Sequence, residues 1–114
     1  MIVVLSFAPM KTTPADQIAH PGLEELELAA VLHALSDPVR LRIVVGLARH
    51  DDVSCGSFDL PVTKSTCTHH FKVLREAGVI RQRQAGTARL NSLRREELDA
   101  RFPGLLDTVL NAAA

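Results

Sequence analysis

The chain has 114 residues, of which 46% are apolar and 23% are charged, and this composition predicts a single globular domain. The formal charge is zero, which argues against a self-repelling disordered chain, and no apolar run approaches the roughly 18 residues of a membrane span. Two cysteines are too few for a disulfide framework, and residues 1–8 are short for a secretory signal and lack a basic leading region. We therefore expect a cytoplasmic protein with reduced thiols and no membrane partner.

Two helices are predicted in the first half of the chain, after an N-terminal arm over residues 1–21 that we expect to be partly disordered. The first helix spans residues 22–35, with apolar residues on one stripe and glutamates in its first turns, where the helix dipole favours acids. Asp37 is the predicted N-cap of a second helix that starts at Pro38 and runs to about residue 50. This second helix is apolar around most of its circumference, so we expect it to be central and buried.

A third predicted helix spans residues 64–77. A short element over residues 53–58 and a turn with a proline lead to Thr63, which caps this helix, and Gly78 closes it as a left-handed residue. Phe71 and Leu74, with Cys67 one turn earlier, define the face that should pack inward. The opposite face then carries cations and hydrogen-bonding groups.

A β-hairpin is predicted next, with arms over residues 79–83 and 89–93 joined by a turn that contains Gly86. The exposed positions of both arms are expected to be Arg and Gln. A short apolar helix over residues 105–111 and a tail over 112–114 complete the chain. The fold class is thus mainly α with a small β-hairpin wing, in the order α-α-short α-α-β-β-α, and residues 22–111 form one domain.

Basic residues are concentrated in one segment. Residues 60–95 contain eight Lys and Arg but a single acid, Glu76, which gives this segment a net charge of +7. The rest of the chain, with five basic and twelve acidic side chains, carries −7. A basic block in a neutral chain is typical of a polyanion-binding surface, although a solvated charged face is the alternative.

The order of a short element, a turn, a polar-faced helix and a basic hairpin is the layout of a winged helix-turn-helix. A helix about 10–12 Å wide fits a DNA major groove roughly 12 Å across. The side chains of residues 65, 68, 69 and 72 point the same way and would reach base edges together. Hairpin arginines would contact phosphates or the minor groove, and Thr63 with the first helical amides would hold a phosphate.

Two motifs in this sequence resemble those of the ArsR/SmtB-type transcriptional repressors: ALSDPVRLRI at residues 34–43 and TKSTCTHHFKVLREAGVI at residues 63–80. The resemblance covers about residues 23–111 and implies a homodimer joined through the helices 22–35 and 105–111, with one recognition helix for each half-site of an operator palindrome. Two departures concern Cys67, where the family usually has valine, and the helix before the turn, which is shorter here.

The resemblance also implies which residues contact double-stranded DNA. It assigns five residues of the helix and four of the wing, to which the helix geometry adds Thr63 at its start and Arg75 at the edge of its polar face. The full predicted set is Thr63, Lys64, Ser65, Thr68, His69, Lys72, Arg75, Arg81, Arg83, Thr87 and Arg89.

Metal and redox sensing are the two effector hypotheses for such a regulator. No spacing pairs His20, His33, His50 and Cys55 on one face, and the C-terminal segment has no histidine, so we expect no metal and no cofactor. Cys55 and Cys67 are the only thiols, and their oxidation to a disulfide would strain the helix that reads DNA. A redox switch is therefore a hypothesis.

Enzymatic function is not indicated, because none of the common nucleotide-binding, metalloprotease or serine-hydrolase motifs occurs in the sequence. We expect a sequence-specific DNA-binding regulator, most simply a repressor, with no catalytic residues. The alternative is a winged-helix module whose basic face binds a protein instead of an operator.

Overall fold

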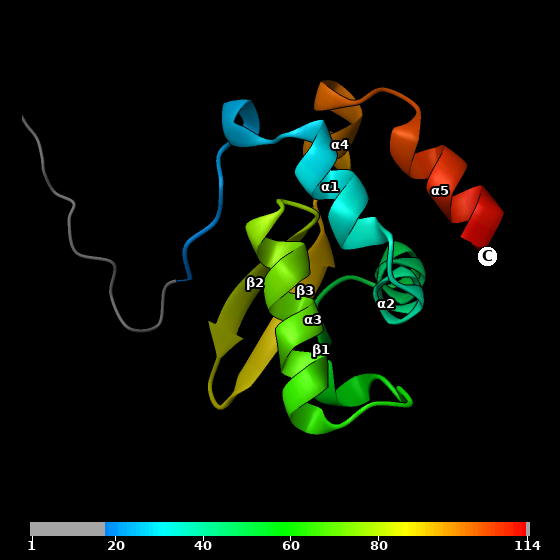
Figure 1. The fold of residues 1–114 in the computed structure, drawn as a ribbon. Coiled ribbons are helices and arrows are strands. Elements are labelled where there is room, and N and C mark those ends of the chain that lie inside the picture. The colour runs from blue at the N-terminus through cyan, green and yellow to red at the C-terminus, as the bar shows by residue number, and fades with distance from the viewer. Residues whose placement is uncertain (1–17, 114) are drawn as a thin grey trace, which may run out of the picture.

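The computed structural model describes residues 18–113, so residues 1–17 of the predicted arm and Ala114 lie outside the described part. Five α-helices and a three-stranded antiparallel sheet are arranged around one core (Figure 1). The predicted class, mainly α with a β-hairpin wing, is confirmed. No helix in residues 18–113 is long and apolar enough to cross a bilayer.

The first α-helix is shorter than predicted. A 3-10 helix, η2 (Leu23–Glu25), precedes α1 (Leu28–Leu35), and Leu26 between them has an extended backbone. The reason is tertiary: the Leu26 side chain is buried, and its carbonyl accepts a hydrogen bond from Nε of Arg101 at 3.1 Å. A continuous helix over residues 22–35 would not place both groups this way, so the prediction of one helix there is wrong.

The second helix, α2 (Pro38–Arg49), begins where the sequence indicated. The Asp37 carboxylate accepts hydrogen bonds from the amides of Val39 and Arg40 at 2.8 and 3.1 Å, which satisfies two free donors of the first turn. Ile43, Val44 and Leu47 are buried, so α2 is central to the core.

The short element after α2 is not an α-helix. It consists of β1 (Val53–Ser54) and a 3-10 helix, η3 (Cys55–Ser57), where a short α-helix was predicted. β1 pairs with β3 (Ala88–Leu93), which adds a third strand to the predicted hairpin and gives the order β1-β3-β2. Two residues are too few to be recognised as a strand without the partner that they pair with.

The hairpin joins β2 (Ile80–Ala85) and β3 in register, with Ala85 opposite Ala88 and only Gly86 and Thr87 in the turn. Gly86 has a φ of +61°, the left-handed conformation that such tight turns require. The strands are longer and the turn shorter than predicted. The prediction that the Arg and Gln positions of the arms are exposed is wrong for Gln82, which is buried.

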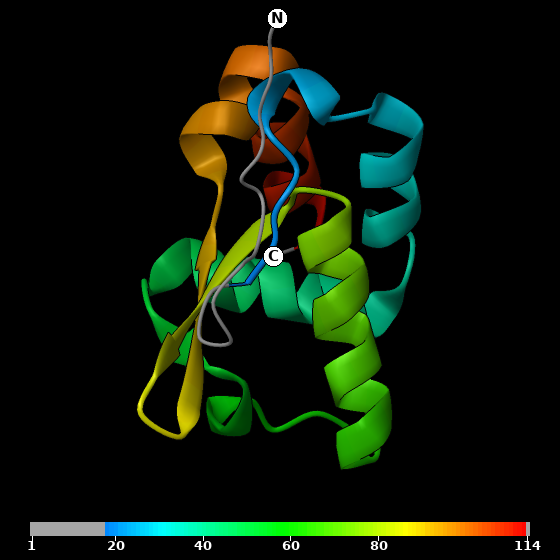
Figure 2. The ribbon, with the colours of Figure 1, turned by 90° about the vertical axis from the view of Figure 1, so that its left-hand side faces the viewer.

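The third long helix, α3 (Lys64–Glu76), lies against the sheet and ends at Gly78, as predicted (Figures 1 and 2). Gly78 has a φ of +86°, and a Cβ at this position would come within 2.1 Å of the Leu26 side chain. Two more helices follow, α4 (Arg95–Arg101) and α5 (Leu105–Ala113). Of these two helices only α5 is predicted from the sequence, and its predicted end at residue 111 is two residues too early.

Candidate nucleic-acid interface

Helix α3 is fixed at both ends and along its inner face. The Thr63 hydroxyl accepts a hydrogen bond from the Thr66 amide at 3.3 Å, so Thr63 is the N-cap. Phe71 and Leu74 are buried, and the Phe71 ring packs edge-on against Phe58 with centroids 5.7 Å apart. This packing sets the rotation of α3 about its own axis.

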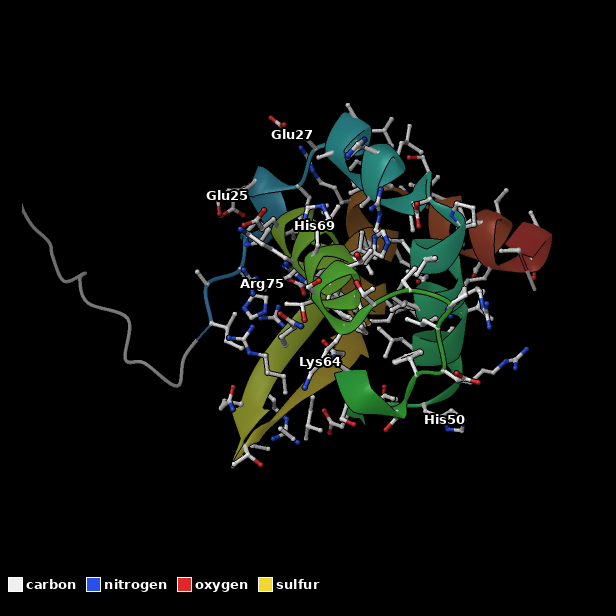
Figure 3. All side chains as sticks on the ribbon, turned by 60° about the horizontal axis from the view of Figure 1, so that its bottom comes forward. Glu25, Glu27, His50, Lys64, His69 and Arg75 are labelled. Atoms are coloured by element: carbon white, nitrogen blue, oxygen red, sulfur yellow. The ribbon has the colours of Figure 1, made fainter. Side chains whose placement is uncertain are left out.

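The opposite side of α3 is open to solvent. All five central members of the predicted helix set are exposed, and no hydrophobic residue of α3 interrupts them on that side: Lys64, Ser65, Thr68, His69 and Lys72. Figure 3 places Lys64 close to the first turn of the helix. A rigid helix thus presents two cations, two hydroxyl groups and an imidazole along one side, which is the mixture that can bind both phosphates and base edges.

Arg75 differs from the rest of the predicted helix set. Its side chain is only 16% exposed and lies on the side of α3 that faces β2 (Figure 3). Its guanidinium donates to Oε1 of Gln82 at 3.1 Å, while its Nε is buried and has no partner within residues 18–113. Arg75 therefore connects α3 to the wing, and most of its surface is withdrawn from the open side.

The four predicted wing residues, Arg81, Arg83, Thr87 and Arg89, are all exposed. Two of these arginines face acids: Arg81 lies 2.9 Å from Glu97, and Arg83 lies 3.3 Å from Asp52. Both pairs are largely solvated and are therefore weak, so a polyanion can compete for the arginines. No ion pair or hydrogen bond holds the Arg89 side chain within the described residues, which leaves it the freest cation of the wing.

The base of the wing is fixed by a network that the sequence did not reveal. Arg94 is 4% exposed and binds both carboxylate oxygens of Glu97, at 2.8 and 2.7 Å, and the carbonyl of Pro21 at 2.8 Å. Hydrogen bonds from Arg94, and then from Arg81, lower the pKa of Glu97 to about 2. Arg94 is one of the basic residues counted in segment 60–95, but its charge is paired with Glu97 inside the protein.

The N-terminal segment that the structure describes also contacts the wing. The amide of Gln82 donates to Nε2 of His20 at 2.9 Å, beside the contact of Arg94 with Pro21. Burial, and then the charge of Arg81, lower the pKa of His20. A neutral ring suits the acceptor role of Nε2. Residues 20 and 21 are thus attached to the domain, although the predicted domain boundary was drawn after them.

A second buried network holds α3 to α2. The guanidinium of Arg40, 8% exposed, donates to Nδ1 of His70 at 3.0 Å and to the carbonyl of Ala34 at 2.7 Å. Nε2 of His70 lies 3.9 Å from Asp37. Burial by itself would raise the pKa of Asp37, but the amides of Arg40 and Val39 lower it overall. His70 thus faces inward and His69 outward, which only the inner-face pattern around Phe71 could have indicated.

The two thiols of the chain line one cavity of about 270 Å³ between η3 and α3. Both cysteines are free and partly buried. Burial, and to a lesser degree the neighbouring Cys55, raise the pKa of Cys67. Among residues 18–113, no three His, Cys, Asp or Glu side chains converge as metal ligands would.

Comparisons with known proteins agree with this architecture. Residues 35–83 match the model of a helix-turn-helix domain family. An uncharacterized HTH-type transcriptional regulator of Bacillus subtilis, YceK, is 36% identical over 84 residues, which are 71% of this chain and 84% of YceK. The chain belongs to the helix-turn-helix transcriptional regulators. A second uncharacterized regulator of this type, MJ1325 of Methanocaldococcus jannaschii, is 35% identical over 57% of this chain and 76% of its own length.

The fold is that of the ArsR type. A crystal structure of an ArsR family transcriptional regulator superposes with a TM-score of 0.58 and covers 76% of this chain and 97% of its own, at 23% sequence identity. The resemblance to ArsR-type winged helix-turn-helix proteins is thereby confirmed. The helix-turn-helix family makes the chain a DNA-binding regulator, and in its winged fold α3 follows the turn and the β2–β3 hairpin forms the wing.

Proposed function

We propose that this regulator is a homodimeric repressor that binds a palindromic operator through α3 and the wing. The observation that carries the proposal is the exposed polar side of α3, which is held in place by a buried opposite side and continues onto an arginine-rich hairpin. The residues that we propose to contact DNA are the exposed members of the predicted set: Thr63, Lys64, Ser65, Thr68, His69, Lys72, Arg81, Arg83, Thr87 and Arg89.

Two roles are assigned within this set. The exposed side chains in the middle of α3, Thr68, His69 and Lys72, would enter the major groove, where each base pair has a distinct pattern of donors and acceptors. The wing arginines, together with the amides at the start of α3, would contact phosphates and fix the orientation of the protein. Arg75 would act indirectly, by holding β2 against α3 through Gln82.

The dimer is supported by apolar surface on α1 and α5. Leu28 and Leu32 are 48% and 46% exposed and lie one turn apart on α1, so together they form an apolar surface. Leu32 also lines a hollow whose other walls are Leu35, Leu41, Val109, Ala112 and Ala113. A second copy of the same surface, related by a two-fold axis, would cover this hollow and place two recognition helices on one face.

Repression follows from this geometry if the operator overlaps a promoter, because a dimer seated in two successive major grooves occupies the DNA that a polymerase needs. A soluble regulator of this kind would act in the cytoplasm. The domain assignment that we propose is one DNA-binding and dimerisation domain over the predicted residues 22–111, extended to include His20 and Pro21 and the end of α5 at Ala113.

Selection of bound sequences from a random duplex library tests the proposal. We expect enrichment of a palindrome whose half-sites are about 10–10.5 base pairs apart, one turn of DNA. The triple variant Lys64→Ala, His69→Ala, Lys72→Ala, processed in parallel, should enrich nothing. Enrichment of no sequence by the wild-type protein would contradict the proposal and favour the alternative, a winged-helix module that binds a protein.

A further inference from the structure

The cavity between η3 and α3 brings the only two cysteines of the protein to one place. Its walls are Cys55, Gly56, Phe58, Leu60, Val62, Lys64, Cys67 and Thr68. Cys55 comes from η3 and Cys67 from the second turn of α3, so the two thiols belong to the two elements that flank the turn of the helix-turn-helix. Both side chains are partly exposed, and small reagents in solution therefore have access to them.

Cys55 is also connected to the wing by buried hydrogen bonds. The Asn91 amide, fully buried on β3, donates to Sγ of Cys55 at 3.3 Å and to the Val53 carbonyl at 2.9 Å. Asn91 accepts in turn from Gln82 at 2.8 Å, and Gln82 accepts from Arg75 at 3.1 Å. The sulfur of Cys55 is therefore the end of a continuous polar chain that runs through both strands of the wing to the recognition helix.

Cys55 also borders a second cavity, of about 520 Å³, between α3 and the wing. Three cations line this cavity, Lys72, Arg75 and Arg89. Partly exposed cysteines in electropositive surroundings are the ones that react with oxidants, whereas cysteines buried in apolar surroundings are inert. Cys67 does not line this second cavity, and burial raises its pKa. These positions assign Cys55 as the thiol that reacts first and Cys67 as the thiol that resolves it.

We propose that Cys55 and Cys67 form a reversible intramolecular disulfide, and that its formation releases the protein from DNA. The DNA-binding part of this proposal rests on the function proposed above. The oxidant is of the hydroperoxide class. The Cys55 thiolate attacks one peroxide oxygen, the O–O bond breaks, and the leaving oxygen departs as water or an alcohol, which leaves Cys55 as a sulfenic acid. Sγ of Cys67 then attacks Sγ of Cys55, the S–O bond breaks, and the oxygen leaves as water.

The bond would act on both DNA-binding elements. A disulfide holds its two Cα atoms about 4.4–6.8 Å apart, so η3 becomes tied to the second turn of α3. Sγ of Cys55 must turn toward Cys67 to form the bond, which removes it from Asn91. Asn91 then loses its hydrogen bond to Cys55, the first bond of the series that continues through Gln82 to Arg75. The orientation of α3 relative to the wing should therefore change. When α3 and the wing can no longer contact their parts of the duplex at the same time, the affinity for DNA falls.

The test measures disulfide formation and DNA binding in the same samples. The full-length protein is treated with hydrogen peroxide and then with dithiothreitol, and intact mass, peptide mapping and electrophoresis without reductant are recorded beside fluorescence anisotropy with a labelled duplex. We expect the loss of two hydrogen atoms per chain, a Cys55–Cys67 cross-linked peptide, no covalent dimer, and an affinity for DNA about tenfold lower, within the usual range of coupling between sites. Dithiothreitol should restore both mass and affinity.

Cys55→Ser and Cys67→Ser are the matched variants, since each keeps the size of the side chain and removes the bond. Both reduced variants should bind DNA as the wild type does, and neither should lose affinity reversibly with peroxide. Absence of the cross-linked peptide in the wild type would overturn the proposal, as would a disulfide that leaves DNA affinity unchanged. Failure of the reduced protein to bind any duplex, with the disulfide still formed, would instead overturn the proposed function and with it the regulatory part of this inference.

Discussion

The guanidinium of Arg40 on α2 donates a hydrogen bond to Nδ1 of His70 on α3 across 3.0 Å, in a part of the protein where both residues are buried. The same guanidinium donates to the carbonyls of Ala34 and His33 in the last turn of α1. One side chain therefore joins three helices. By holding His70 inward, it keeps His69, the next residue along α3, on the exposed side.

Replacing Arg40 with alanine should destabilise the fold, because buried carbonyls and the His70 ring lose a charged donor. We expect the free energy of unfolding to fall by about 1.5–3 kcal/mol, the usual contribution of a hydrogen bond to a charged group. Urea denaturation measures this value. Arg42→Ala, two residues along the same helix and exposed, is the control and should change stability by less than about 0.5 kcal/mol. Equal stabilities of the two variants would show that the Arg40 network is not important for the fold.

Replacing His69 or Lys72 with alanine should weaken DNA binding and leave the melting temperature nearly unchanged, because both side chains are exposed on α3. A lost base or phosphate contact is expected to cost about 1–3 kcal/mol of binding free energy. Anisotropy titrations and thermal melts check the two readouts. Arg95→Ala is the charge-matched control, since Figures 1 and 2 place α4 at the end of the molecule opposite the hairpin tip. If His69→Ala unfolds the protein, our orientation of α3 is wrong.

Glu97 should make stability depend on pH at the base of the wing. Its pKa is lowered from 4.5 to about 2, so its ionised form stabilises the folded protein above the pKa that the group has when unfolded. This contribution is lost as the pH falls from about 5 toward 2. Because a third of the side chain is exposed, we expect about 1 kcal/mol. At pH 7 the free energy of unfolding of the wild type should exceed that of Glu97→Gln by this amount, and the difference should shrink in acid.

Leu32 tests the proposed dimer. Replacing it with glutamate places a charge in the middle of the exposed apolar surface of α1 and should raise the dimer dissociation constant by about 30-fold, the effect of roughly 2 kcal/mol at a central interface position. Sedimentation equilibrium measures the constant. Thr87→Glu adds the same charge at the hairpin turn and should leave it unaltered. A Leu32→Glu protein that associates as tightly as the wild type would place the interface elsewhere.

Features that depend on neighbouring residues in the sequence were predicted correctly. Asp37 caps α2 and Thr63 caps α3 because an N-cap needs only its own side chain and the amides two or three residues ahead. Gly78 ends α3 for a comparable reason, since its left-handed backbone is a local requirement. The inner face of α3 followed from the spacing of Phe71 and Leu74.

Features that depend on residues distant in the sequence could not be predicted in this way. The break at Leu26 results from its packing beside Gly78, more than fifty residues away. β1 exists only because Val53 and Ser54 pair with β3. The count of charges over residues 60–95 also treats every basic residue alike. Arg94, however, is buried and binds Glu97 and Pro21, so only part of the positive charge lies at the surface. Charge counting identifies a basic region, but tertiary contacts decide which cations are free.

The most direct test of the central claim is the dependence of duplex binding on salt concentration. If α3 and the wing bind phosphates, the logarithm of the association constant should fall linearly with the logarithm of salt concentration, by about 0.9 for each contact. Arg89→Ala, which removes an exposed wing cation, should reduce that slope by about one contact, whereas Arg95→Ala should not. A slope near zero, or equal slopes for Arg89→Ala and the wild type, would contradict the account.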